Sequence, residues 1–272
     1  MQTTTEYFSK KGMSYCLDGN FEEGLKLFNR GLDFDENSIL LLYNKAGCLK
    51  SLNRDNEAKI LLNKVISICD SQEKTEQNLK LKSNALVLLK NFDEAIDVLE
   101  EILEKTPNDI DSLMNMAICY DHHFNNKKTL EYLDRILKID PSDLHALLMK
   151  SEVLMHMNKL DESKEYMDMA FEINPSDAHV WYLKGQYESK LSNYESALKY
   201  YEKALDIEPN ASKYIFDAGI CMILLGKIDE AKSTLKRIFD LNPEDYDPER
   251  YEYIDEICEI LRNTFPSSKG DN

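Results

Sequence analysis

Several features that would point to a particular class of protein are missing from the 272-residue chain. No run of 18 apolar residues occurs, so we expect no membrane-spanning helix. The first residues, MQTTTEYFSKKGMSYC, lack the apolar core of a signal peptide, so we expect no secretion. Glycine occurs only nine times, which is few for a β-rich chain with frequent turns. These absences favour a helical, cytoplasmic protein.

Motifs of catalysis and of disulfide frameworks are missing as well. The chain has no Gly-rich phosphate loop, no HExxH and no GxSxG, so we predict that it is not an enzyme and needs no cofactor. Its cysteines form no CxxC pair, and we expect them to be buried free thiols in a reducing cytoplasm. They lie at positions 16, 48, 69, 119, 221 and 258.

Positive charge is scarce relative to negative charge. Lys and Arg number 33 against 50 Asp and Glu, so the formal net charge is 33 − 50 = −17. Phosphate backbones and anionic membrane surfaces would be repelled, which excludes nucleic acid as an expected partner. The 43% of hydrophobic residues is enough for a core, so the chain is expected to fold.

What the chain does contain is a repeat. Five prolines recur every 34 residues, and each follows an apolar run and precedes a short polar segment such as Ser142-Asp143. Proline ends a helix, and Ser or Asp caps the next one. The pattern therefore predicts helical hairpins, with the five prolines at 107, 141, 175, 209 and 243.

Seven units fit this period. The step from 39 to 76 is 37 residues long, so three extra residues lie around Ser71–Thr75, and we expect a deformable joint over 66–76. The predicted units span 5–38, 39–72, 76–109, 110–143, 144–177, 178–211 and 212–245.

Two columns of the aligned units hold only small residues. Helices approach closely where a small side chain lies at their crossing, and large residues fill the space beside it. The eighth and twentieth places are therefore predicted crossings, and a single hairpin must stack on others to bury its apolar face. The eighth place holds Gly12, Ala46, Ser83, Ala117, Ser151, Gly185 and Gly219.

With these columns the chain resembles the tetratricopeptide repeat (TPR) family. The clearest copy runs from Trp181 and Gly185 through Tyr194 and Ala197 to Pro209, and the resemblance covers about residues 5 to 264. It implies an all-α, right-handed superhelical solenoid of antiparallel helix pairs, forming a single domain over 1–264. Residues 246–264 look like a capping helix, and 265–272 are expected to be a disordered tail.

The resemblance also implies where a partner would bind. In the family, first helices line a concave groove with the second, fifth, sixth, ninth, twelfth and thirteenth residues of each unit. Six apolar anchors are expected, namely Leu148, Met149, Tyr182, Leu183, Phe216 and Ile220. The candidate groove comprises these six with Tyr43, Asn44, Lys80, Asn84, Met114, Asn115, Ile118, Glu152 and Gln186, and Ile223 and Leu224 extend it.

One subset of the family grips the free carboxylate at the end of a peptide. Lys80, Asn84 and Asn115 match the first three positions of that clamp, whereas His145 and Met149 do not match the last two. The bidentate arginine is missing, so a terminal-carboxylate site remains an open alternative. In either case Lys80, Asn84 and Asn115 are expected to orient the polar end of the ligand.

All five histidines lie between positions 122 and 179, which suggests a metal site. Equivalent places in stacked units lie about 10 Å apart, whereas zinc ligands lie about 2 Å from the ion. Polar residues along a groove rim are therefore the favoured interpretation. A metal- or ligand-dependent regulator stays as an alternative that would use His122, His123, His145, His156 and His179.

Together these features predict a non-catalytic scaffold or adaptor that binds a peptide or helix of a partner protein in its groove. The partner is expected to be apolar with some positive charge, to suit the acidic chain. A self-associating structural protein is the main alternative. Replacing Leu148 and Phe216 together with glutamate is predicted to abolish capture while the helices survive.

Overall fold

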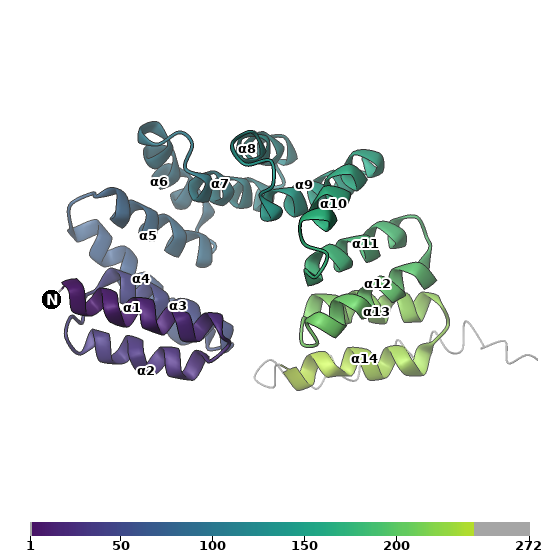
Figure 1. The fold of residues 1–272 in the computed structure, drawn as a ribbon, viewed down its shortest axis with the longest axis horizontal. Coiled ribbons are helices and arrows are strands. Elements are labelled where there is room, and N and C mark those ends of the chain that lie inside the picture. Colours follow the sequence, from purple (N-terminus) through teal and green to yellow (C-terminus); the bar gives the residue numbers. More distant parts are fainter. Residues whose placement is uncertain (1, 242–272) are drawn as a thin grey trace, which may run out of the picture. The chain divides into compact units, whose positions relative to one another are not determined.

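The computed structural model describes residues 2–241, and Figure 1 traces their helices in chain order. These residues form fourteen helices and contain no strand. The helices are α1 (Gln2–Leu17), α2 (Phe21–Leu32), α3 (Ile39–Ser51), α4 (Asp55–Ser71), α5 (Glu76–Leu88), α6 (Phe92–Lys105), α7 (Ile110–His122), α8 (Asn126–Ile139), α9 (Leu144–His156), α10 (Leu160–Ile173), α11 (Ala178–Lys190), α12 (Tyr194–Ile207), α13 (Ser212–Leu224) and α14 (Ile228–Leu241).

The helices pair as seven hairpins, as the repeat predicted. Six of the predicted unit starts coincide with the first residue of a helix, from Ile39 of α3 to Ser212 of α13. The first unit differs, because α1 begins at Gln2 and not at position 5. The predicted fold class, an all-α solenoid of antiparallel helix pairs, is confirmed. The predicted capping helix 246–264 and tail 265–272 lie outside the described residues.

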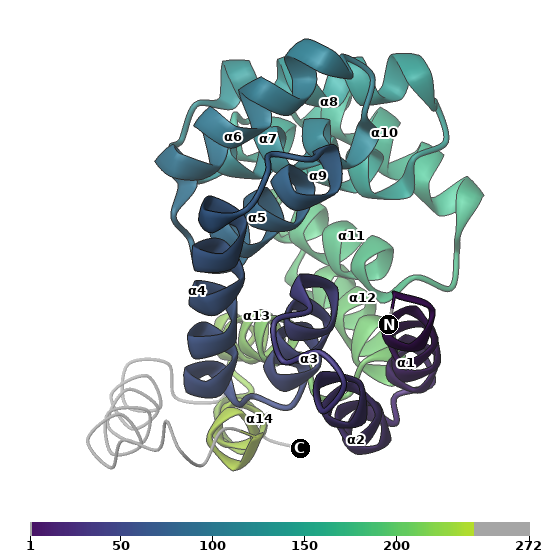
Figure 2. The same ribbon diagram turned by 90° about the vertical axis from the view of Figure 1, so that its left-hand side faces the viewer.

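The hairpins fall into two compact units, of which the first comprises residues 1–139 and the second begins at Asp140. Helices α1 to α8 belong to the first unit, and α9 to α14 belong to the second. Within the first unit, α1, α2 and α3 pack on one another and lie side by side in Figures 1 and 2. The expectation of a single domain over 1–264 stays a prediction.

In three hairpins an aspartate side chain caps the first of the two helices. The polar segments that follow the prolines predicted such caps. Asp109 accepts a hydrogen bond from the backbone N–H of Ser112, and Asp143 accepts one from Ala146. Asp177 does the same at the start of α11. Each cap satisfies a backbone donor that the first helical turn leaves unpaired, and so helps to fix where the helix begins.

The small residues at the eighth and twentieth places of the repeat lie where the two helices of a hairpin cross. A Cβ added at Gly12 would lie 2.4 Å from the ring of Phe28, and one added at Gly219 would lie 2.5 Å from Leu235. In both hairpins the eighth residue thus faces the twenty-fourth. In α9 and α10, Ser151 and Ser163 meet at the predicted crossing and exchange hydrogen bonds of 2.8–3.0 Å. In these hairpins the small residues thus allow the two helices to approach each other closely.

A turn conformation recurs that the sequence pattern did not reveal. The fifteenth residue of every unit has a positive φ, between 53° and 76°, where the first helix ends. Glycine, which adopts this conformation without strain, fills only the first and last of these places. Packing of the two helices therefore imposes the turn. The residues are Gly19, Asn53, Lys90, Phe124, Asn158, Ser192 and Gly226.

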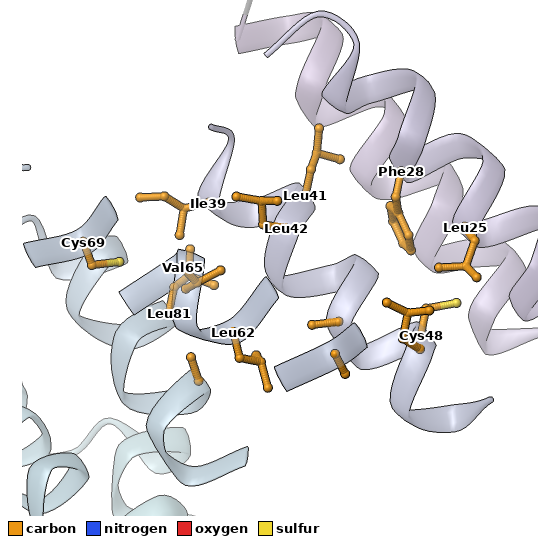
Figure 3. Close-up of a cluster of buried hydrophobic side chains, with 14 of the residues drawn as sticks. Leu25, Phe28, Ile39, Leu41, Leu42, Cys48, Leu62, Val65, Cys69 and Leu81 are labelled. Atoms are coloured by element: carbon orange, nitrogen blue, oxygen red, sulfur yellow. The ribbon is translucent and has the colours of Figure 1, made fainter. Parts of the chain in front are cut away.

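Within the first compact unit, an apolar cluster runs across neighbouring hairpins. In the first unit, one cluster runs from Phe8 through Leu42 and Leu62 to Ala85, and so links α1 to α5. Figure 3 shows part of it, with side chains from neighbouring helices directed toward one another. Each hairpin thus covers the apolar face of the next, as a stacked repeat requires.

The three extra residues after the second repeat (39–72) lengthen its second helix, α4. Helix α4 has 17 residues, whereas α6 has 14. At the place where five of the seven repeats carry proline, the second repeat has Asp70, and its helix continues to Ser71. Residues 66–71 of the expected joint over 66–76 are thus helical, and the deformability of the joint stays a prediction. Residues 72–75 form the connection.

We predict that the amides of residues 72–74 exchange faster with deuterated solvent than those of the matched connection 106–109. Within 72–75 the structure has one backbone bond, from the N–H of Thr75 to the carbonyl of Glu73. The 106–109 connection has two, from Thr106 to Ile102 and from Asp109 to Thr106. Hydrogen exchange read by mass spectrometry measures both segments. Equal protection of the two would contradict the prediction.

Candidate binding surface on the first helices

Three of the predicted anchors lie in the second compact unit and are buried. The expectation that they offer apolar surface to a partner is therefore wrong. Leu148 of α9 is 2% exposed, and Tyr182 and Leu183 of α11 are fully buried. A side chain without exposed area contributes to the core and cannot gain apolar burial by binding. Met149 lies half-buried. Leu148, Tyr182 and Leu183 therefore stabilise the hairpins and do not offer anchoring surface.

Tyr182 is buried because residues of α12 and α13 cover it. The Tyr214 ring stacks on it at 4.6 Å between ring centroids, and the Tyr201 ring lies at 5.6 Å. The ammonium of Lys213 lies 4.8 Å from the ring centre. Lys213 also pairs with Glu152 of α9 at 2.8 Å, so its side chain links α13 to α9 next to Tyr182.

A short hydrogen-bond network joins α11 to α13. The Tyr182 hydroxyl donates to Oδ2 of Asp217 at 2.6 Å and accepts from Nε2 of Gln186 at 2.6 Å. Burial, and next the bond to the Asp217 carboxylate, raise the pKa of Tyr182, so the hydroxyl keeps its proton. Burial likewise raises the pKa of Tyr214 to about 12. The network holds the Asp217 carboxylate in place.

The Gln186 side chain has one atom without a partner. Its Oε1 is buried and makes no hydrogen bond in the structure. Exchanging the two amide atoms would not help, because the single Tyr182 proton already goes to Asp217. A buried acceptor without a donor costs free energy, so this atom would gain from a donor.

Three apolar side chains remain exposed on α13, and we call them the α13 row. Phe216 is 52% exposed, Ile220 is 37% exposed and Leu224 is 53% exposed. They lie four residues apart, so they share one face of the helix. Two of them, Phe216 and Ile220, are predicted anchors that the structure leaves accessible.

A hollow of about 150 Å³ adjoins the row. Ile220 belongs to both, and the hollow is otherwise lined mainly by polar side chains of α9, α11 and α13. It therefore places the Asp217 carboxylate beside the apolar row. The sequence did not single out Asp217, although it stands at a groove-lining sixth place, because the anchors expected there were apolar. The lining residues are Met155, His156, Gln186, Ser189, Lys190, Tyr201, Asp217, Ile220 and Cys221.

In the first compact unit, the polar candidates Lys80, Asn84 and Asn115 already have partners. The ammonium of Lys80 pairs with Asp109 at 2.6 Å and with Glu76 at 3.0 Å, and the bonds to these two carboxylates raise its pKa. Nδ2 of Asn115 donates to Oδ1 of Asn84 at 2.6 Å. A peptide carboxylate would have to displace Asp109, so the arrangement argues against the carboxylate clamp.

Asp109 has a structural role besides its pair with Lys80. It caps α7 through Ser112, as well as pairing with Lys80. Burial opposes ionisation, but the hydrogen bonds from Lys80 and Ser112 lower the pKa of the Asp109 carboxyl below its usual value. The Lys80–Asp109 pair thus belongs to the local structure of α5 and α7.

The remaining candidates of the first unit are half-buried. Nδ2 of Asn44 donates to the Ser9 hydroxyl at 2.9 Å, joining α3 to α1. Burial raises the pKa of the Tyr43 hydroxyl. Met114 and Ile118 of α7 also lie half-buried. None of these four predicted residues is as exposed as the α13 row.

Among the five histidines, His122 and His179 contact neighbouring side chains. His122 stacks on Phe92 with 4.2 Å between ring centroids. Nε2 of His179 lies 3.9 Å from Glu152, and burial lowers the pKa of His179. Among residues 2–241, no three His, Cys, Asp or Glu side chains are grouped as a metal site requires. Nor does this part of the chain contain a helix long and apolar enough to cross a bilayer.

Solved structures with the same arrangement of hairpins are known. A TPR protein from Parabacteroides merdae is 17% identical, with a TM-score of 0.67 over 80% of this chain and 84% of its own. A TPR protein from Thermus thermophilus is 20% identical, with a TM-score of 0.60 over 66% and 98%. A chain of the APC/C hetero-tetramer Cut9–Hcn1 is 11% identical, with a TM-score of 0.71 over 93% and 48%. At these identities the likeness shows the fold alone.

Family models give the assignment from the sequence side. No curated protein matches the chain in sequence. The model of the tetratricopeptide repeat protein 21 C-terminal ARM domain matches residues 71–215, which are 145 of the 272. Two tetratricopeptide repeat models match residues 190–251 and 40–72. With seven stacked hairpins built on a 34-residue period, the chain belongs to the tetratricopeptide repeat family.

Proposed function

We propose that this protein is a binding scaffold whose α13 row holds an apolar segment of a partner protein. The observation that carries the proposal is the exposure of Phe216, Ile220 and Leu224 on one helix face, at groove-lining places of the repeat. Exposed apolar side chains gathered on one face commonly mark an interaction site. TPR proteins generally bind other proteins and are generally non-catalytic.

The chemistry around the row suggests the partner. A segment with two or three apolar side chains would cover the row, either as a helix or as an extended strand. The Asp217 carboxylate in the adjoining hollow suits a Lys, an Arg or another donor next to those apolar residues. The net charge of −17 would favour the approach of a basic segment. The unpartnered Gln186 oxygen lies in the same lining.

Binding and not catalysis is proposed as the working principle, and the cytoplasm as its setting. The five described cysteines are free thiols, which suits a reducing compartment. The alternative that uses the histidines has less support, because the described residues bring no three metal-ligating side chains together, and His122 and His179 contact an aromatic ring and a carboxylate instead.

The test is a pair of double variants with equal change in charge. Peptides selected on the wild-type protein from a random display library would be measured against Phe216→Glu/Ile220→Glu by fluorescence polarisation. Half-exposed side chains of this size each contribute about 1 kcal/mol on full burial. Losing both and adding two carboxylates should therefore weaken binding by about 100-fold or more.

The matched control is Ile173→Glu/Ile207→Glu, on α10 and α12. These residues are 43% and 45% exposed but lie on second helices. The control should bind the selected peptides as the wild type does. If both double variants bind equally well, the binding surface is not the α13 row.

The same variants address self-association. Light scattering over a range of concentrations would detect a second copy on the row, since Phe216→Glu/Ile220→Glu would then reduce the mass. That result would favour the self-associating alternative over a foreign partner. A monomer that binds selected peptides would support the proposal.

A further inference from the structure

Two thiols that are distant in sequence meet in the first unit. Cys16 lies in the last turn of α1, and Cys48 lies in α3. Their sulfur atoms are 3.2 Å apart, although 32 positions separate the residues. Packing of α1 and α3 against α2 brings them together. Cys16 is half-buried, which corrects the expectation that every cysteine is buried.

A glycine makes room for the pair. A Cβ added at Gly24 in the first turn of α2 would lie 2.5 Å from Sγ of Cys16 and 3.6 Å from Sγ of Cys48. Any side chain at this place would therefore press on the Cys16 sulfur. Because position 24 is bare, the two sulfurs can lie together at the crossing of α1 and α2.

The two thiols differ in how easily they react. Cys48 is 3% exposed, and its thiol donates to the carbonyl of Phe21 at 3.1 Å. Figure 3 shows it among the buried side chains near Leu25 and Phe28. Burial, followed by the contact with Cys16, raises the pKa of Cys48 to about 12. A thiol reacts as its thiolate, so the partly exposed Cys16 is the one that a reagent in solution meets first.

We propose that Cys16 and Cys48 form a redox pair, which a small-molecule disulfide of the glutathione type converts reversibly to a disulfide linking α1 to α3. The Cys16 thiolate attacks one sulfur of the small disulfide, forms a mixed disulfide and expels one small thiolate. Cys48 then gives up its proton, attacks the Cys16 sulfur and expels the second small thiol. In sum, two protein thiols are oxidised and one small disulfide is reduced to two thiols.

The geometry suits that second step. A disulfide has its sulfurs about 2.05 Å apart, so the two atoms need to approach by about 1 Å. The new bond would close a loop across the first two hairpins and restrict the unfolded chain, which raises the stability of that region. No other pair of cysteines among residues 2–241 has a sulfur–sulfur hydrogen bond. The pair is independent of the α13 row, which lies in the other compact unit.

The wild-type protein supplies the first test. The reduced full chain would be incubated with glutathione disulfide, alkylated and digested for mass spectrometry. A peptide pair joined through Cys16 and Cys48 is expected, with the number of free thiols falling from six to 6 − 2 = 4. Dithiothreitol should restore all six. The oxidised form should also melt at a higher temperature than the reduced form.

Three variants establish the order of events. Cys48→Ser should stop at the mixed disulfide on Cys16, which adds about 305 Da. Cys16→Ser should form neither species. Cys69→Ser is the matched control, because the Cys69 thiol likewise donates to a backbone carbonyl, that of Asn78, and it should form the Cys16–Cys48 link normally.

Two results would overturn the inference. One is a wild-type protein that keeps a stable mixed disulfide at Cys16 and yields no linked peptide. The other is a wild-type protein whose free thiols stay unchanged under the same treatment. Neither result depends on whether a variant folds.

Discussion

Replacing Leu148 with glutamate is expected to unfold the second unit, whereas replacing Phe216 with glutamate leaves it folded. Leu148 is 2% exposed in α9, so the substitution removes a buried apolar side chain and buries a carboxylate. We expect a loss of at least about 4 kcal/mol in the free energy of unfolding. Phe216 is 52% exposed, and its substitution should change that free energy by less than about 0.5 kcal/mol.

Thermal melts followed by circular dichroism measure both effects, and limited proteolysis locates them. The two substitutions add the same charge at the same place of the repeat and both remove a large apolar side chain, so the main difference between them is burial. A Leu148→Glu protein that melts with the wild type would contradict the burial of this side chain. The double variant Leu148→Glu/Phe216→Glu is unsuitable as a binding test, because loss of binding would follow from unfolding.

Replacing Gly185 with valine is expected to destabilise the protein by about 3 kcal/mol, at the upper end for overpacking. A Cβ at this position would lie 2.4 Å from Cε1 and 2.5 Å from Cδ1 of Tyr201. The Tyr201 ring is buried and lies against Tyr182, so it cannot turn away without opening the core. Helices α11 and α12 would have to separate.

Gly47→Val is the matched control. Gly47 also lies in a first helix, but a Cβ there would have no atom within 4 Å. The same substitution should change stability by less than about 0.5 kcal/mol. Urea titrations of both variants provide the comparison. Equal midpoints would show that the crossing of α11 and α12 tolerates a side chain.

Gly185 and Gly47 show what the repeat pattern could predict about packing. Gly185 stands in the eighth column, where every unit has a small residue, and the structure shows why. Gly47 stands one place later, where no column required glycine, and the structure leaves the space open. The pattern therefore separated a packing glycine from an incidental one.

The candidate surface was harder to predict, because exposure depends on neighbours that are distant in sequence. Leu148, Tyr182 and Phe216 all occupy the fifth place of their units, yet the first two are buried and the third is half exposed. Tyr182 is covered by Lys213 and Tyr214 of the next hairpin. The family resemblance indicated that the fifth place lines the groove. It could not indicate which side chains of the next hairpin cover that place.

By itself the sequence determined the hairpins, the starting residues of six of them, their crossings and the family. These depend on a 34-residue period and on local preferences of proline, aspartate and small residues, which act over a few turns of helix. Only the tertiary structure decided which groove residues stay accessible, that Lys80 is already paired, and that Cys16 meets Cys48. Those facts arise from contacts between hairpins, which depend on how particular side chains fill the space between stacked helices.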